Sequence, residues 1–218
     1  MTVPAPGKIR IMVLGASLRA GSLNNRLARL AAGCAADRGA QVDLADMSEF
    51  DVPLYDFDTQ EHDGIPAGAH AFRDRLLAAQ GFVIASPEYN ASMPGVLKNL
   101  IDWVSRFTPQ PFKGRHGLLM SASPSMSGGN RGLWALRVPL EHLGAVLQPE
   151  MFSLAQAHEA FGPDGQIADP ALGTRFAETI AAFLDLTEAA THYPCARSAW
   201  VEFLGERTSG ETERVEVS

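Results

Sequence analysis

Cysteine is scarce in this chain, and its scarcity removes two classes of small protein. Only Cys34 and Cys195 occur among the 218 residues. Cys34 falls inside a predicted helix and Cys195 near the end of the chain. Neither a disulfide framework nor a zinc site of several cysteines can be built from two such residues. We expect both to be free thiols.

Long apolar runs and an excess of positive charge are also missing. No run approaches the roughly 20 apolar residues of a membrane span, and the first residues lack the apolar core of a secretory signal. The formal net charge of −7 gives no attraction to nucleic acid or anionic lipid, because both are polyanions. We therefore expect a cytoplasmic protein with no nucleic-acid partner and no membrane partner.

Clustered metal ligands are absent as well. The six histidines are scattered, with no pair four residues apart on a helix and no accompanying group of carboxylates. A metal site is therefore not expected.

The chain contains alternating apolar patterns typical of one α/β domain. Short apolar runs are followed by stretches with helical periodicity. The first predicted helix places Leu23, Leu27, Leu30, Ala31 and Cys34 on one face and ends at Gly39; the second turns Phe72, Leu76 and Leu77 inward. The predicted strands are 9–15, 42–47, 82–86, 116–123 and 146–154, and the helices after the first are 65–79, 94–107, 129–143 and 170–189.

This alternation predicts a doubly wound, five-stranded parallel sheet in a three-layer α/β/α arrangement. In such sheets the ligand lies beyond the carboxyl ends of the strands, where the winding reverses. The informative loops are those after the first, third and fourth strands.

The predicted domain organisation has three parts. Residues 1–8 form a flexible start, 9–190 the domain, and 191–218 an arm and tail, ordered around Trp200, Phe203 and Leu204. Inside the domain, the Asp-rich segment 51–65 is most simply a surface loop, with an active-site lid as the alternative.

The loop after the first strand has the composition of an anion site. It reads Gly-Ala-Ser-Leu-Arg-Ala-Gly-Ser-Leu-Asn over 15–24 and contains no acid. Unpaired N–H groups at a helix start hold a phosphate, and Ser17, Ser22 and Asn24 can add donors. Ser22 or Asn24 alone is more simply a helix cap. The loop is neither a Walker A sequence nor a dinucleotide-binding glycine motif, so a mononucleotide phosphate fits better.

The loop after the third strand is Pro87-Glu88-Tyr89-Asn90. An aromatic side chain there can lie against a planar ring, and the amides of a tight turn can donate to ring heteroatoms such as those of a flavin. Taken singly, Tyr89 is more often a packed tyrosine, and Glu88 a solvated or cap-pairing carboxylate.

These two loops together carry a resemblance to a known family. Ser17-Leu18-Arg19 with Gly21-Ser22 and Asn24, followed by Pro87-Glu88-Tyr89-Asn90 and the segment 94–103, resembles the NADPH-dependent FMN reductases. That family includes flavodoxin-like quinone, azo-dye and chromate reductases, and the likeness covers about 9–189. It implies that Ser17, Arg19, Ser22, Leu23 and Asn24 hold the FMN phosphate, and that Pro87, Glu88, Tyr89 and Asn90 line the isoalloxazine.

The loop after the fourth strand, 123–132, resembles the family's Ser/Gly-rich segment beside the pyrimidine edge of the flavin. Ser123, Gly128 and Gly129 are the expected contacts, since glycine permits close backbone approach. Arg131 either helps to set the flavin potential or is a surface arginine without that role. Asp102 and Glu141 are interpreted as structural or intersubunit ion-pair residues.

The resemblance implies an enzyme that passes hydride from NAD(P)H through bound FMN to quinones or similar small acceptors in a ping-pong reaction, with no catalytic side chain. It also implies a homodimer or homotetramer. Three alternatives stay open at this point: FMN as a free substrate, an FMN-binding electron carrier, and a regulatory flavoprotein.

Overall fold

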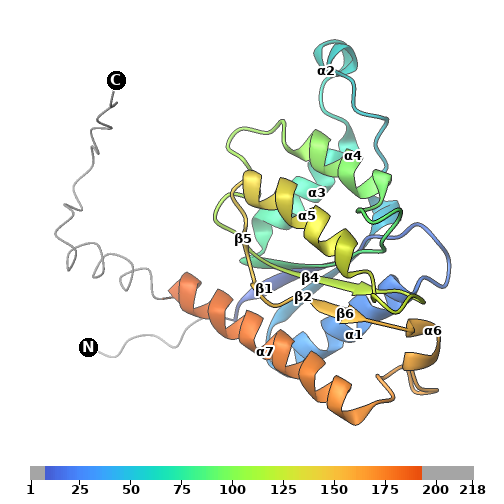
Figure 1. The fold of residues 1–218 in the computed structure, drawn as a ribbon. Helices are drawn as coiled ribbons and strands as arrows, with labels where there is room; N and C mark the ends of the chain where they lie inside the picture. Colours follow the sequence, from blue (N-terminus) through green and yellow to red (C-terminus); the bar gives the residue numbers. More distant parts are fainter. Residues whose placement is uncertain (1–7, 193–218) are drawn as a thin grey trace, which may run out of the picture.

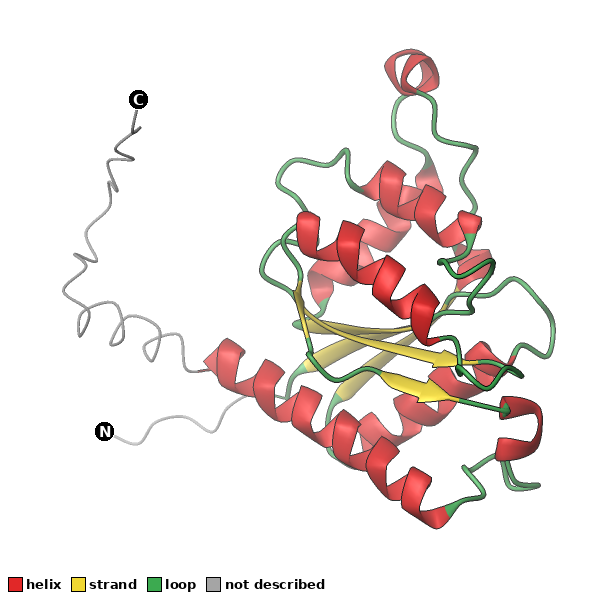
Figure 2. Cartoon of the chain, viewed as in Figure 1, coloured by secondary structure: helices red, strands yellow, loops and turns green. Residues whose placement is uncertain are grey.

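A parallel β-sheet forms the middle layer of the molecule (Figures 1 and 2). The structure is a computed structural model that describes residues 8–192. The sheet has the order β2-β1-β3-β4-β5, with β6 beside the second half of β4. Its strands are β1 Arg10–Gly15, β2 Gln41–Asp46, β3 Gly81–Ala85, β4 His116–Ala122, β5 Val146–Leu147 and β6 Phe152–Leu154.

The winding reverses beside β1, because β2 pairs with one edge of it and β3 with the other. Gly15 is in register with both Asp46 and Ala85, so the three strands end at one level. Every residue of β3 is buried, as expected of a central strand covered on both faces. The predicted flavodoxin-like α/β fold is confirmed, and it opens a crevice at the carboxyl ends of β1 and β3.

Helices cover both faces of the sheet and enclose two apolar cores (Figure 1). Phe72, Trp103 and Leu136 lie in the core under α3, α4 and α5, whereas Leu27 and Phe176 lie in the core under α1 and α7. The long helices are α1 Leu23–Asp37, α3 Ala67–Ala78, α4 Gly95–Val104, α5 Asn130–His142 and α7 Pro170–His192. Shorter ones are the 3₁₀ helix Met47–Glu49, α2 Phe57–Asp63 and α6 Ala157–Ala160.

Two details of the predicted elements are wrong. The fifth strand is not continuous over 146–154: β5 pairs with the start of β4 and β6 with its end. Pro149 lies in the gap, and proline has no N–H to give to a ladder. Leu77 does not point inward, because it is 44% exposed, and only Phe72 and Leu76 of the three predicted side chains are buried.

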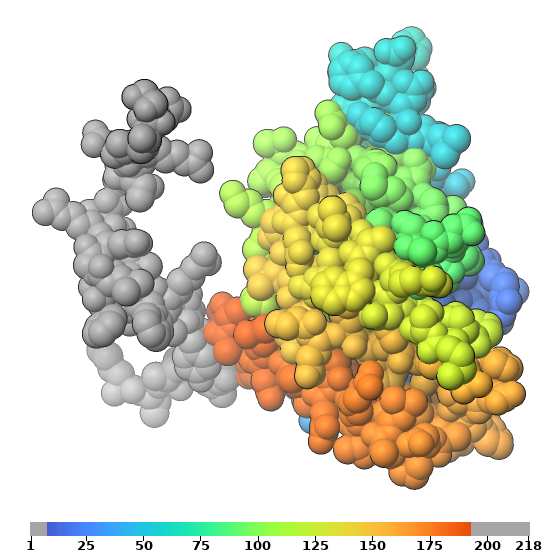
Figure 3. Space-filling view, viewed as in Figure 1, coloured from blue at the N-terminus to red at the C-terminus, as the bar shows by residue number. Residues whose placement is uncertain are grey.

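The segment 51–65 is only partly a loop, since it contains α2. No residue of α2 is buried, and the helix projects from the end of the molecule beyond α4 (Figures 1 and 3). The segment is anchored at its base, where the Pro53 carbonyl accepts hydrogen bonds from Asn99 Nδ2 and Trp103 Nε1, each at 2.8 Å.

Helix α7 continues to His192, two residues past the predicted domain end at 190. The predicted arm with Trp200, Phe203 and Leu204, and also Cys195, lie outside the described residues, and the domain boundaries stay predictions. Within residues 8–192, none of the helices has the length and apolarity that crossing a bilayer requires.

Candidate functional site

Three loops at the carboxyl edge of the sheet meet around one cleft of about 130 Å³. They follow β1, β3 and β4, the strands on which the sequence placed the site. A hollow of this size encloses a small anion, and a larger ligand would extend from it over the exposed neighbouring surface. The lining consists of Ser17, Arg19, Ser22, Leu23, Asn24, Pro87, Glu88, Tyr89, Ala122, Ser123 and Pro124.

The start of α1 supplies hydrogen-bond donors to this cleft. Ser22 is the N-cap, and its hydroxyl oxygen accepts from the N–H groups of Asn24 and Asn25 at 3.2 and 3.4 Å. Within the described residues, the backbone N–H groups of Ser17 and Leu23 find no acceptor. The hydroxyls of Ser17 and Ser22 are nearly buried, and each keeps a proton to donate. Together with the positive end of the helix dipole, these donors suit a phosphate.

Arg19 adds a positive charge at the rim of the cleft. Its side chain is exposed, and its one hydrogen bond to residues 8–192, from Nη2 to the Gly21 carbonyl at 3.4 Å, is long. No carboxylate pairs with it in the part of the chain that the structure describes. The guanidinium is thus available to an incoming anion.

Asn24 has a different use from the free phosphate donor expected of its side chain. Its carboxamide is buried, donates from Nδ2 to the Ala122 carbonyl and accepts the Ala122 N–H, both at 2.9 Å. These bonds tie the first turn of α1 to the end of β4. Asn24 therefore fixes two walls of the cleft relative to each other.

Asn25, which the sequence analysis did not single out, performs a similar task on the other side. Its Nδ2 donates to the Ser17 carbonyl at 3.0 Å and to Asp46 Oδ2 at 3.2 Å. Gly15 makes room for it, because a Cβ at Gly15 would lie 2.7 Å from Asn25 Oδ1. The sequence could have indicated this role, because Asn25 is a second amide beside Asn24 in the first turn of a helix that must pack on β1.

A tight turn carries Tyr89 at the end of β3. Tyr89 and Ser92 exchange two backbone hydrogen bonds at 2.9 and 3.0 Å. Between them Asn90 and Ala91 both have positive φ, 52° and 60°, the arrangement of a type I′ turn. The turn leaves the Tyr89 side chain 53% exposed beside the cleft, where a flat ring can lie against it.

Glu88 is held tightly beside Tyr89 and is not solvated. Its Oε1 accepts from Arg131 Nε and Nη2 at 2.9 and 2.5 Å, and its Oε2 accepts the Gly132 N–H at 3.0 Å. Its side chain is only 6% exposed. Burial alone would raise the pKa of this carboxyl, but the bonds from Gly132 and Arg131 outweigh burial and hold the pKa below its ordinary value.

The glycines of the third loop approach the protein's own strands closely. Gly129 has φ of +85°, and a Cβ there would lie 2.0 Å from Ser121 Oγ. Gly128 has φ of +61°, and its Cβ would lie 2.9 Å from the Ala155 nitrogen. Both glycines let the loop lie flat on the ends of β4 and β6. Ser123 in turn accepts the Ser125 N–H at 3.2 Å and lines the cleft.

Most of the residues proposed from the sequence therefore share one cleft. Asn90, Gly128 and Gly129 are the proposed residues outside its lining, and Ala122 and Pro124 are lining residues that the sequence analysis did not select. Adjacency to Ser123 was the available signal for both. Which of these residues contact a ligand stays a prediction.

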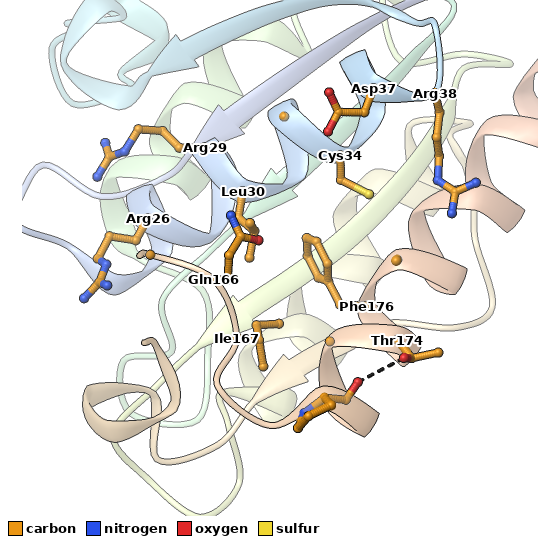
Figure 4. A pocket seen from close by; sticks show the side chains of 15 residues that line it. Arg26, Arg29, Leu30, Cys34, Asp37, Arg38, Gln166, Ile167, Thr174 and Phe176 are labelled. Carbon is orange, nitrogen blue, oxygen red and sulfur yellow. Dashed lines mark hydrogen bonds between the residues drawn. The ribbon is translucent and has the colours of Figure 1, made fainter. Parts of the chain in front are cut away.

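A larger groove of about 930 Å³ lies elsewhere, between α1 and the segment leading into α7 (Figure 4). Leu30, Ile167 and Phe176 form its apolar middle, while Arg26 and Arg38 lie at opposite ends. Arg26 and Arg29 lie at one end of the groove and Arg38 at the other (Figure 4), and the backbone N–H groups of α1 along the groove donate within the helix. It lacks the donor set of the smaller cleft.

Asp102 and Glu141 are both in ion pairs, as the sequence interpretation held. Asp102 accepts from Lys98 Nζ at 2.7 Å, and Glu141 from Arg137 Nη2 at 2.5 Å, each across one helical turn. Within residues 8–192, no group of three or more His, Cys, Asp or Glu side chains could hold a metal ion.

Comparison with known proteins identifies the family. The family model described as NADPH-dependent FMN reductase matches residues 9–159. A quinone reductase of Escherichia coli (strain K12) is 36% identical over 167 residues, which cover 74% of this chain and 86% of that protein. An NAD(P)H-dependent FMN reductase of Pseudomonas aeruginosa is 37% identical over 163 residues, covering 74% and 85%.

A solved structure agrees with the sequence matches. FerB, a flavoenzyme NAD(P)H:(acceptor) oxidoreductase from Paracoccus denitrificans, is similar with a TM-score of 0.70 and 28% identity, over 83% of this chain and 97% of FerB. The family suggested by the motifs in the loops after β1 and β3 is confirmed. The chain belongs to the NADPH-dependent FMN reductases, enzymes whose cofactors are FMN and NADPH.

Proposed function

We propose that this enzyme holds FMN in the cleft between the three loops and transfers reducing equivalents from NAD(P)H to quinones or similar small acceptors. The observation that supports it is the convergence, in one cleft, of unpartnered N–H groups, buried hydroxyls and an exposed tyrosine ring. Phosphate donors and a ring platform are what a flavin mononucleotide requires.

The chain's own residues divide the work of binding. The N–H groups of Ser17 and Leu23, the hydroxyls of Ser17 and Ser22, and the guanidinium of Arg19 would hold the phosphate. Asn24 and Asn25 fix these donors to β4 and β2. Pro87, Glu88 and Tyr89 would form the wall beside the flavin ring, with Asn90 shaping the turn.

When bound, FMN would supply the redox chemistry, since a flavin can accept a hydride and pass on two electrons. The balance is NADPH, one proton and a quinone giving NADP⁺ and a hydroquinone. The protein's part is to position the rings of the substrates against the flavin and to exclude competing reactions. We therefore propose no side-chain nucleophile or general acid. Because one bound flavin would serve the donor and the acceptor in turn, the kinetics should be ping-pong.

Anaerobic reduction followed by steady-state kinetics tests this function. NADPH added to the FMN-loaded protein should bleach the blue-light absorption band, and a benzoquinone should restore it. Initial rates at several quinone concentrations should give parallel double-reciprocal lines. A band that NADPH leaves unchanged would favour the electron carrier, and flavin lost on gel filtration would favour FMN as a free substrate.

We also propose that the chain forms a homodimer or homotetramer in the cytoplasm. Trp134 and Val138 are four residues apart on α5 and are 57% and 70% exposed, so one side of this helix presents an apolar surface. The atoms of α5, yellow-green to yellow in Figure 3, lie at the surface of the molecule. Light scattering should give a mass of two or four chains, and Trp134→Glu should lower it. Cell fractionation checks the location.

A further inference from the structure

We propose that Glu88 and Arg131 act as a charge-balanced positioning pair, which fixes the Tyr89 turn against the loop after β4 and keeps net charge away from the flavin. This inference rests on the proposed function, because it assigns the pair a task only where FMN occupies the cleft. It gives one shared role to two residues for which the sequence suggested separate roles.

The contacts show that the pair joins the two loops. Glu88 lies in the loop after β3, and Arg131 lies in the first turn of α5, 43 residues later. The carboxylate uses both oxygens, Oε1 on Arg131 and Oε2 on the Gly132 N–H. A charge-assisted pair with an additional backbone donor is among the stronger polar contacts in proteins.

The backbones around the pair are packed without spare room. A Cβ on Gly132 would lie 3.1 Å from both Glu88 Cα and the Ser92 carbonyl oxygen. A Cβ on Gly129 would lie 3.6 Å from Glu88 Cβ. Since Tyr89 directly follows Glu88 and makes two bonds with Ser92, a shift at Glu88 moves the exposed ring.

The burial of the two partners differs, and this difference gives the pair its electrostatic role. Glu88 is a lining residue of the cleft and its side chain is 6% exposed, whereas that of Arg131 is 64% exposed. The negative charge is therefore poorly screened where a ligand would lie, and Arg131 is its neutralising partner. Reduced FMN carries more negative charge than oxidised FMN, so it responds most to an imbalance of this pair.

The test compares Arg131→Met, Glu88→Gln and the double variant, each loaded with FMN, by measuring the flavin reduction potential at pH 8. Arg131→Met should lower the potential, because an unbalanced carboxylate opposes the reduced form. Glu88→Gln keeps the side-chain size and an acceptor for Gly132, so it should fold, and the released arginine should raise the potential. The double variant should lie near the wild type.

The expected change in the ratio of the dissociation constants of oxidised and reduced FMN is about tenfold for each single variant, which corresponds to about 30 mV for a two-electron couple. Arg137→Met and Glu141→Gln are the matched controls, since they break an Arg–Glu pair of the same 2.5 Å length on the same helix, away from the cleft. The controls should keep the wild-type potential.

The outcomes separate this inference from the proposed function. Wild-type protein that binds FMN and is reduced by NADPH, with both single variants shifted in the same direction or not at all, would overturn the paired-charge role alone. Wild-type protein that does not bind FMN would overturn the proposed function as well. A loss of FMN affinity in both single variants without opposite potential shifts would leave only a structural contact.

Discussion

The site depends most on Gly129 having no side chain. Alanine there meets Ser121 Oγ at 2.0 Å and must also adopt a φ of +85°. Left-handed strain and overpacking together should lower the free energy of unfolding by about 2–5 kcal/mol, measured by urea denaturation. FMN affinity should fall too, because a displaced loop would move Arg131 and Gly132, which hold Glu88 beside the Tyr89 turn.

The control for Gly129→Ala is Gly165→Ala. Gly165 has a similar φ of +80°, but no atom lies within 4 Å of its Cβ position. Gly165→Ala should therefore lower the free energy of unfolding only through backbone strain, by about 1–2 kcal/mol. Equal losses in the two variants would show that close packing on Ser121 does not matter.

Ala91 is a second strained residue, placed at φ +60° in the turn that carries Tyr89. Ala91→Gly removes the strain but adds unfolded-chain entropy, so stability should be unchanged or raised by up to about 1 kcal/mol, with FMN affinity retained. Ala91→Val should weaken FMN binding, since a branched side chain resists positive φ. Calorimetry measures the stability and the FMN affinity of both variants. A valine variant that binds FMN normally would refute the role of this turn in FMN binding.

Individual site residues were only partly predictable from the sequence. Ser22 was foreseen as either a cap or a phosphate ligand, and the structure shows the cap while leaving its proton for a ligand. The role of Asn24 depends on Ala122, 98 residues away, and no local pattern reveals such a partner. The Glu88–Arg131 pair was missed for the same reason.

At the scale of elements, helix α1 both caps the cleft and covers the sheet. Gly33 lies on its exposed side, and a Cβ there would have no atom within 4 Å. Gly33→Ala should therefore raise the free energy of unfolding by about 0.5–1 kcal/mol in a urea titration, with FMN affinity unchanged. A decrease in stability would mean that the exposed face of α1 is covered in solution.

The elements themselves were well predicted where a period ran over many residues. Strands β1, β3 and β4 and helices α1, α3, α4, α5 and α7 lie within a few residues of their predicted bounds. The wrongly predicted segments were short. Helix α2 has no buried face, so its sequence shows no apolar period, and the break between β5 and β6 spans only a few residues around Pro149. On α3, Leu77 was predicted to point inward together with Leu76, but only Leu76 is buried.

At the scale of the whole molecule, the Asp43–Arg75 pair joins the edge strand β2 to α3. Arg75 donates to both oxygens of Asp43, at 2.7 and 3.1 Å. The hydrogen bond from Arg75 holds the pKa of Asp43 below its ordinary value, against the opposing effect of burial. A carboxyl with a lowered folded-state pKa stabilises fully above its unfolded pKa, about 3.8, and that stability is lost as pH falls through the folded value.

Asp43→Asn should therefore lower the free energy of unfolding by about 1–2 kcal/mol at pH 7. The difference in stability from the wild type should shrink below about pH 4. Urea denaturation at pH 7, 5 and 3 measures it. Asp102→Asn is the control, because its pair with Lys98 is more exposed and should be worth under about 1 kcal/mol. A difference that stays constant down to pH 3 would contradict the assigned ionisation.

A crystal structure of the protein grown with FMN would show most directly where the molecule holds its flavin. We expect the phosphate at the start of α1, beside Ser17 and Ser22, with the flavin ring against Tyr89. An empty cleft, or flavin in the larger groove between α1 and α7, would contradict this position of the flavin.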